Sequence, residues 1–142
     1  MNRISFRNAV MGGVFVAAAV AAAIEVKPGD DLQAVLNRGE NLELQKGAVY
    51  EISKTLNYTQ PGQRIHTKGA RFPSEYATLK NVNTNLVTLV NAWPVERVVL
   101  EHVICDGNRY ELSVIPYPES GEVIHQPGIL NFGGAEGQVV RD

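Results

Sequence analysis

The sequence predicts an all-β domain, and more specifically a β-solenoid in which the chain coils through a repeated set of short strands. Only one short segment has helical periodicity, and nearly everything after it reads as strands of about three to five residues. The turns are too irregular for a series of hairpins, since Asp106-Gly107 is the one typical hairpin pair between two candidate strands. A coil with three corners and roughly two dozen residues per rung fits this pattern. Short strands alone leave a β-sandwich open as the alternative.

Residues 1–23 are predicted to form a secretory signal peptide rather than part of the fold. Arg3 and Arg7 provide a positive start, an uncharged and mostly apolar stretch follows, and the small residues Ala21–Ala23 suit a signal peptidase. The uncharged stretch Ala9–Ile24 is shorter than the roughly 18 to 20 residues that span a bilayer, which disfavours a retained membrane anchor. We therefore expect a secreted or periplasmic protein, cleaved near Ala23, whose mature part is one domain over residues 24–142.

Charge and cysteine content exclude several classes of function. The chain has 13 Lys and Arg residues and 15 Asp and Glu residues. Since the leader contains two of the basic residues and none of the acidic ones, the mature part has a net charge of −4. A mildly acidic domain without a basic stripe is a poor candidate for binding nucleic acid, or anionic lipid after the leader is removed. Cys105 is the only cysteine, so no disulfide within the chain can support the fold.

The predicted elements begin with a short amphipathic helix. Its apolar face consists of Leu32, Val35 and Leu36. Asp30 or Asp31 can cap its start, and Gly39 ends it. Short strands bounded by Gly, Asn and Pro are predicted to follow. They cover Leu42–Gln45, Val49–Ile52, Thr55–Tyr58, Arg64–Thr67, Ala77–Lys80, Leu86–Val90, Arg97–Leu100, Val103–Cys105, Gly128–Phe132 and Gln138–Val140.

Several stretches between about residues 30 and 109 resemble the opening of pectate-lyase-like proteins, a superfamily of right-handed parallel β-helices. Asp31–Leu36 is similar to the short helix that caps the N-terminal end of these solenoids. Leu42–Ile52 resembles the family's apolar strand followed by Pro-Gly-Thr-Tyr, with Lys46 in place of the proline. Pro61–Ile65, together with the following Lys-Gly pair, resembles the turn into the next rung.

The best match to this superfamily is Val98–Asn108, where two apolar strands flank a small corner and an Asp-Gly-Asn turn closes the segment. The resemblance implies that Glu101 and His102 lie at the bend. It also implies an inward-facing set that consists of Val98, Leu100, Val103 and Cys105. The fold expected from the resemblance is a right-handed parallel β-helix with a short N-terminal capping helix. Because no capping element is recognisable near Gln138–Asp142, we expect this solenoid to be incomplete at its C-terminus.

The resemblance implies an exported, carbohydrate-related protein. One expectation is the N-terminal part of a polysaccharide lyase or glycoside hydrolase that acts on a polysaccharide, including uronic-acid polymers, and is inactive alone. The alternative is a non-catalytic glycan-binding or structural β-solenoid of a surface or phage-tail type. No catalytic motif is identifiable, so whether the chain is an enzyme stays open. No cofactor is expected from the residues themselves, and Ca²⁺ enters only through the resemblance.

Four residues are candidates for substrate binding. Trp93, Tyr110 and Tyr117 could stack on sugar rings, although packing of loops onto the solenoid wall is the alternative role for all three. Arg109 could contact an acidic sugar or act as the base of a lyase, as could Arg97, although a solvated surface charge is the expected role of both arginines. Residues 110–127 contain three prolines and form the most probable protruding loop, where binding usually resides.

Other polar residues have simpler interpretations than chemistry. His102 and Cys105 lie close in sequence, but without a second cysteine or spaced histidines we expect a corner residue and a core residue, not a nucleophile or a metal site. Asp106-Gly107-Asn108 is interpreted as a turn rather than a calcium or sugar contact. Paired carboxylates would be needed for hydrolysis, and the following acids are instead expected to be solvated surface charges. They are Glu96, Glu101, Glu119 and Glu122.

Overall fold

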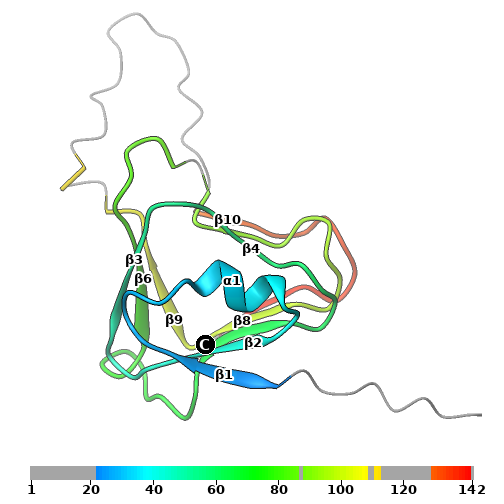
Figure 1. Ribbon diagram of the computed structural model, residues 1–142, viewed down its shortest axis with the longest axis horizontal. Helices are drawn as coiled ribbons and strands as arrows, with labels where there is room; N and C mark the ends of the chain where they lie inside the picture. Colours follow the sequence, from blue (N-terminus) through cyan, green and yellow to red (C-terminus); the bar gives the residue numbers. More distant parts are fainter. Residues whose placement is uncertain (1–21, 87, 109–110, 113–128, 142) are drawn as a thin grey trace, which may run out of the picture.

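The computed structural model describes residues 22–86, 88–108, 111–112 and 129–141, and this part of the chain is mostly β (Figure 1). Its one helix is α1 (Leu32–Asn37). The strands are β1 (Ala23–Val26), β2 (Asn41–Leu44), β3 (Val49–Ile52), β4 (Leu56–Asn57), β5 (Arg64–Thr67), β6 (Ala77–Asn81), β7 (Val90–Asn91), β8 (Val99–Glu101), β9 (Val103–Asp106), β10 (Leu130–Asn131) and β11 (Val139–Arg141). The predicted bounds of β3 and β5 are confirmed to the residue. The predicted leader lies outside the described residues, apart from Ala22 and Ala23 at its end.

The strands form three parallel sheets. Their orders are β1-β2-β5-β8-β11, β3-β6-β9 and β10-β7-β4. All strand pairs among the described residues are parallel, and from β2 onward each strand pairs with the strand three places along the chain. Figure 1 shows the chain passing from sheet to sheet around a common interior. This topology is compatible with a β-helix-like solenoid, and it excludes the antiparallel β-sandwich that the strand pattern had left open.

The register shows how unequal the rungs are. Leu42 pairs with Ile65, Ile65 with Leu100, and Leu100 with Val140, so successive rungs advance by 23, 35 and 40 residues. The expected two dozen residues fit the step from β2 to β5 and the step of 26 residues from β6 to β9, but not the later steps in the largest sheet. Later rungs are longer because loops are inserted at their corners, and a solenoid tolerates such insertions when the strands still stack in register.

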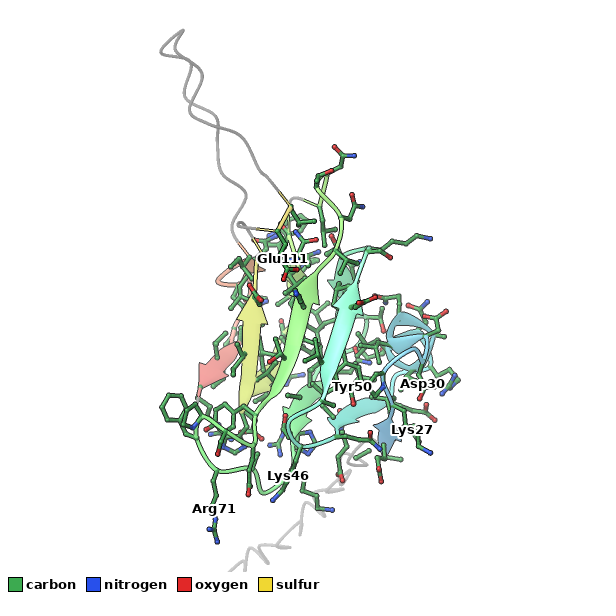
Figure 2. All side chains as sticks on the ribbon, turned by 90° about the vertical axis from the view of Figure 1, so that its left-hand side faces the viewer. Lys27, Asp30, Lys46, Tyr50, Arg71 and Glu111 are labelled. Carbon is green, nitrogen blue, oxygen red and sulfur yellow. The ribbon has the colours of Figure 1, made fainter. Side chains whose placement is uncertain are left out.

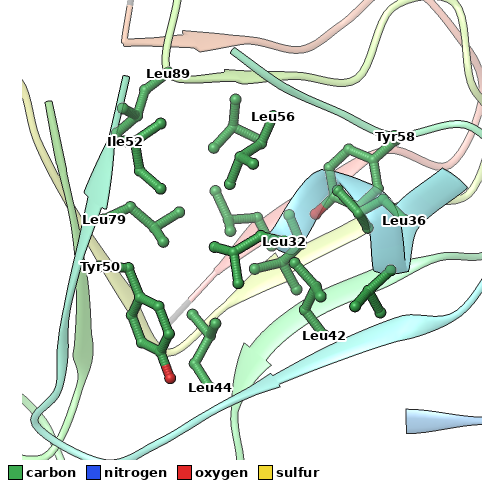
Figure 3. Packing of buried hydrophobic residues seen from close by; sticks show 14 of the residues in the cluster. Leu32, Leu36, Leu42, Leu44, Tyr50, Ile52, Leu56, Tyr58, Leu79 and Leu89 are labelled. Carbon is green, nitrogen blue, oxygen red and sulfur yellow. The ribbon is translucent and has the colours of Figure 1, made fainter. Parts of the chain in front are cut away.

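The helix α1 forms where the sequence predicts it. The Asp31 carboxylate accepts the N–H of Ala34 at 3.0 Å, which makes Asp31 the N-cap, whereas Asp30 binds the N–H of Lys27 at 2.7 Å. Gly39 follows with a positive φ of 81°. The three apolar residues of the predicted face are all buried, and Figure 3 shows Leu32 and Leu36 directed toward the strand residues of the core.

The core consists of stacked rows of inward-pointing side chains. One row runs through Leu42, Ile65 and Leu100, which lie on neighbouring strands of the largest sheet. Another joins Tyr50 to Leu79 across β3 and β6. Figure 3 shows such residues from different sheets meeting in one interior. Because strands of consecutive rungs lie about 4.8 Å apart, each inward residue packs directly on its neighbour above and below.

A corner with a left-handed backbone precedes each of the strands β2, β5, β8 and β11 of the largest sheet. The residues at this corner are Gly39, Gly62, Arg97 and Gly137, with φ of 81°, 81°, 55° and 70°. Each lies two positions before the first residue of a strand of that sheet. This repeat is hard to recognise in sequence because its spacing follows the unequal rungs and because one of its members is an arginine.

Several predicted strands are wrong in their extent: the strand predicted over Thr55–Tyr58 is reduced to Leu56–Asn57, for example, and two others have an identifiable cause. The strand predicted over Leu86–Val90 is reduced to Val90–Asn91, because side-chain amides bond the backbone of the preceding loop instead. Asn81 accepts the N–H of Asn83 at 2.8 Å, and Asn83 accepts that of Asn85 at 3.0 Å. The strand predicted over Arg97–Leu100 begins only at Val99, since Arg97 occupies the left-handed corner.

The segment Val98–Asn108 largely has the arrangement that the resemblance implies. Val98 and Leu100 are buried, while Val103 and Cys105 pack half-buried against the core. His102 forms the bend between β8 and β9, with φ of 55°. The predicted turn after β9 is present, with the N–H of Asn108 bound to the Asp106 carboxylate at 2.7 Å. Its left-handed residue is Asn108.

Candidate functional site

Of the four residues predicted to bind substrate, Trp93 is the one that the structure describes. Arg109, Tyr110 and Tyr117 lie outside the described residues, as do most of the predicted protruding loop and the acids Glu119 and Glu122. Trp93 lies in the turn between β7 and β8, and 59% of its surface is exposed. A large aromatic side chain this exposed is available for contact with a ligand.

The indole of Trp93 rests on the backbone of the next rung. A methyl group at Gly134 would overlap Cδ1 of this indole and would also crowd Nε1 and Cγ, so only glycine leaves room for the ring. Trp93 therefore packs against Gly134, which agrees with the alternative role of packing onto the solenoid wall. It is exposed at the same time. Its ring is held on one side and open on another.

A ladder of asparagine side chains positions the turn that carries Trp93. Asn91 donates to Asn57 at 2.9 Å, and Asn131 donates to Asn91 at 2.7 Å, across three consecutive rungs. The same Asn91 oxygen accepts the N–H of Trp93 at 3.3 Å. From the next corner, Gln138 donates to the carbonyls of Ala92 and Val95 at 2.9 and 2.8 Å. The backbone on both sides of the tryptophan is thus fixed by side-chain amides.

A row of ionisable side chains crosses the outward face of the largest sheet. Consecutive strands contribute Glu25, Glu43, His66, Glu101 and Arg141, each in register with the next. These residues are far apart in sequence and no motif joins them, so sequence reasoning did not connect them. The outward positions of each candidate strand could be predicted from its alternating pattern. The register between strands of different rungs could not, and the row depends on that register.

Glu101 is the most deeply placed carboxylate of this row. Arg141 Nε donates to its Oε2 at 2.7 Å, and Arg64 Nη1 lies 3.1 Å from its Oε1. Only 7% of its side chain is exposed, so the expectation that Glu101 is a solvated surface charge is wrong. Burial acts to raise the pKa of this carboxyl, but the hydrogen bond from Arg141 and the two positive charges outweigh it, and the net shift is downward. With both oxygens engaged, Glu101 is suited to an ion pair that joins three rungs rather than to acid–base chemistry.

His66 lies between two carboxylates of the row. Its Nε2 is 3.8 Å from Glu43 Oε2, and its Nδ1 is buried without a hydrogen-bond partner. Burial, followed by the nearby Arg64 charge, lowers its pKa against the opposing effect of the carboxylates. Neutral imidazole is therefore favoured here.

Two basic side chains and two carboxylates meet in a shallow, open depression at the end of this sheet. It is lined by Glu25, Glu43, Leu44, Gln45, Lys46 and Lys68. The loop that begins at Lys68 closes against it, because Lys46 Nζ lies 3.0 Å from Glu75 Oε2. Figure 2 shows Lys46 at the same edge of the molecule as Arg71, which belongs to this loop. None of these residues was singled out in the sequence as a binding residue.

An aromatic cluster lies in the same loop. Phe72 is exposed and contacts Tyr76 edge to face with 5.5 Å between ring centroids, and Tyr76 lies 5.4 Å from the His102 ring. His102 is thus a corner residue in an aromatic contact, as expected of a structural role.

Cys105 has the environment of a core residue. Burial raises the pKa of its thiol to about 11, so the thiolate is scarce at neutral pH. Among the described residues, no three His, Cys, Asp or Glu side chains gather in a way that could hold a metal ion. Glu96 and Arg97 form an exposed pair at 3.0 Å, as expected of surface charges.

In a comparison with known proteins, no family model, curated protein or solved structure matches the chain. Within the described residues, no helix has the length and apolar character needed to cross a membrane.

Proposed function

We propose that this chain is an exported, pectate-lyase-like protein whose described rungs form the N-terminal part of a right-handed parallel β-helix, and that these rungs bind a polysaccharide. The proposal joins the parallel-sheet topology to the sequence resemblance over residues 30–109. Export follows from the leader pattern in residues 1–23.

The role of α1 as an N-terminal cap is part of this proposal. The Gln33 side chain accepts the N–H of Asn57 at 2.7 Å and donates to its carbonyl at 3.0 Å. These are the two bonds that a neighbouring strand would otherwise make to β4. The helix thus supplies both apolar cover and hydrogen bonds at an edge that would be open without it.

The observation that carries the binding function is the open indole of Trp93. A flat aromatic ring, exposed on one side and held by Gly134 on another, matches the apolar C–H face of a pyranose. Since the amide ladder through Asn91 fixes the turn, little conformational entropy is lost when a sugar stacks on the ring.

We propose further that the described rungs bind without turnover and belong to the larger machinery of a lyase or hydrolase. Glycoside hydrolysis needs a pair of carboxyl groups, one acting as general acid and the other as nucleophile or as the base that activates water. Glu101 is occupied by Arg64 and Arg141, which supports a structural role for it.

A purely structural solenoid is the second candidate, and one surface favours it. Val49 and Ile104 are exposed on the outward face of the β3-β6-β9 sheet and flank Thr78 in register. A flat row of β-branched residues could pack against another copy of the chain. Sedimentation that shows a concentration-dependent trimer without glycan binding would favour this candidate.

The test of the proposed function is affinity electrophoresis of the purified full chain in gels that contain polygalacturonate or a neutral glucan. Retardation by at least one polymer is expected. Trp93→Ala should weaken it several-fold, since an aromatic contact contributes about 0.5–1.5 kcal/mol. Gly134→Ala should do the same while shifting the emission of Trp93, the chain's one tryptophan, because the added methyl displaces the indole.

The matched control is Phe72→Ala, which removes another exposed aromatic ring at a different corner. Equal losses in Phe72→Ala and Trp93→Ala would point to nonspecific adhesion and contradict a site at Trp93. Absence of retardation in every polymer would contradict the binding function. If the chain is mixed with polygalacturonate in solution, a steady increase in absorbance from unsaturated uronate products would show that it turns substrate over. That result would contradict binding without turnover.

A further inference from the structure

The first strand of the largest sheet begins at the predicted cleavage point of the leader. The leader pattern predicts hydrolysis of the peptide bond between Ala23 and Ile24. In the structure both residues belong to β1, which lies beside β2 (Figure 1) and pairs with it in parallel from Ala23 and Asn41 onward. One residue earlier, the carbonyl of Ala22 accepts the N–H of Asn41 at 2.9 Å. The bond to be cut therefore lies within a hydrogen-bonded pair of strands.

Inward side chains and a hydrogen bond from the core hold β1 on the solenoid. Val26 is buried, and Ile24 packs half-buried against the same core. The hydroxyl of the buried Tyr50 donates to the carbonyl of Val26 at 2.7 Å and accepts the N–H of Gln45 at 2.9 Å. Since Val26 is the last residue of β1 and Gln45 follows β2 directly, this one hydroxyl joins the ends of the two strands.

A peptidase cannot use β1 as a substrate while the strand is docked in this way. Extended peptides are commonly bound through hydrogen bonds to their main chain, as an added strand is. In docked β1 the carbonyl of Ala22 is already bonded to β2, and the side chains of Ile24 and Val26 lie against the core. Cleavage then proceeds through a locally opened state, and its rate follows the population of that state when closing is fast. The bond between Val26 and Tyr50 lies beyond the cut, so the shortened strand keeps it.

We infer that the leader is removed after Ala23 while β1 is undocked, and that pairing of β1 with β2 protects the uncleaved chain from the peptidase. Water adds across the amide bond between Ala23 and Ile24. Its oxygen joins the carbonyl carbon of Ala23, which becomes a carboxylate, and its two protons pass to the nitrogen of Ile24, which leaves as an ammonium group. This inference rests on the export proposed above and does not depend on polysaccharide binding.

The experiment uses the purified full chain and a bacterial signal peptidase in detergent, with Glu25→Cys and Glu43→Cys introduced together. These two residues are paired in register, and neighbouring strands lie about 4.8 Å apart, a separation that a disulfide can bridge. Oxidation should lower the cleavage rate at least about tenfold because it locks β1 onto β2, and reduction should restore the rate. The unaltered chain, whose one cysteine is Cys105, controls for the oxidant and should be cut at the same rate in both conditions.

Tyr50→Phe should raise the cleavage rate about fivefold, because it removes the hydroxyl that joins the ends of β1 and β2. Tyr58→Phe is the matched control, since the buried Tyr58 hydroxyl also donates to a main-chain carbonyl, that of Val99 at 2.6 Å, but makes no bond to β1. This control should leave the rate within about twofold, although it too loses a hydrogen bond. Equal increases in the two variants would show that cleavage follows unfolding of the whole domain, and would overturn the inference.

Two other results would overturn the inference while the proposed export stands. One is an oxidised double-cysteine chain that is cut as fast as the reduced one. The other is a cleaved product whose mass places its amino terminus at a residue other than Ile24. If the peptidase cuts neither the unaltered chain nor the reduced double-cysteine chain at any position, the proposed export fails, and this inference fails with it.

Discussion

Arg97 and Gly137 occupy the same corner in consecutive rungs, and both have a left-handed backbone, with φ of 55° and 70°. The two residues are stacked, since a Cβ at Gly137 would lie 3.0 Å from Arg97 Cγ. The N–H of Arg97 donates to the carbonyl of Glu136 at 2.8 Å, and the N–H of Gly62 donates to that of Glu96 at 3.1 Å. The corner is thus a hydrogen-bonded column in which glycine is the natural residue and arginine the exception.

Arg97→Gly should stabilise the fold. A left-handed conformation costs a non-glycine residue about 1–2 kcal/mol, and glycine removes that cost at some expense in the entropy of the unfolded chain. The Arg97 side chain contributes little to stability, because its ion pair with Glu96 is exposed. We expect the free energy of unfolding in urea to rise by about 0.5–1 kcal/mol.

Gly62→Ala is the matched counterpart of this change. No atom lies within 4 Å of a Cβ at Gly62, so its cost should be purely conformational, about 1 kcal/mol of lost stability. If Arg97→Gly destabilised the protein, or if Gly62→Ala were neutral, the corner would not have the conformational role described.

Gln63→Leu should be strongly destabilising. Gln63 is completely buried, and its amide donates to the carbonyls of Leu36 and Glu40 at 2.8 and 3.1 Å. Its oxygen accepts the N–H groups of Thr59 and Gln60 at 2.7 and 2.8 Å. Leucine has similar volume but leaves these groups without partners, so we expect a loss of at least about 2 kcal/mol in urea unfolding. Gln60→Leu, an exposed side chain, should change stability by less than about 0.5 kcal/mol.

His66 should make stability depend on pH in the mildly acidic range. Burial and the charge of Arg64 lower its folded-state pKa below the ordinary value of 6.5, even though Glu43 and Glu101 oppose them. The unfolded chain then takes up a proton more readily than the folded chain. The contribution of neutral His66 is complete above about pH 6.5 and is lost as the pH falls from there through the folded-state pKa.

The measurement for His66 is urea unfolding between pH 7.5 and 5, compared with His66→Gln, which has no titrating group at this position. The pH slope of the free energy of unfolding should be shallower in the variant. This window lies above the range in which Glu101, whose folded-state pKa is also lowered, takes up its proton. Parallel slopes in the two proteins would show that His66 does not titrate differently on folding.

Local features of the chain could be predicted from the sequence. The short helix observed as Leu32–Asn37 was predicted because its apolar spacing, a capping Asp30 or Asp31 and the terminal Gly39 all lie within one short window. The strands Val49–Ile52 and Arg64–Thr67 were predicted because each has its turn residues immediately beside it. Trp93 was a candidate because a flat aromatic side chain can stack on a sugar ring.

Relationships between rungs could not be predicted in this way. The strands of Glu43, His66 and Glu101 are brought into one row by advances of 23 and 35 residues, and no fixed period in the sequence reveals such unequal steps. The same register buries Glu101 between two arginines and places Gly134 under Trp93. A surface charge and a buried ion pair look alike in sequence, because only the neighbours contributed by other rungs distinguish them.

The sequence by itself determined most of the short strands, the helix α1 and the positions of most turns, since these depend on apolar spacing and on turn residues within a few positions of each other. The tertiary structure decided which strands pair, and therefore which charges meet on the outward face and which lysines border the depression. That division has one physical reason: local preferences act along the chain, whereas hydrogen bonding between parallel strands selects neighbours from different rungs whatever their separation in sequence.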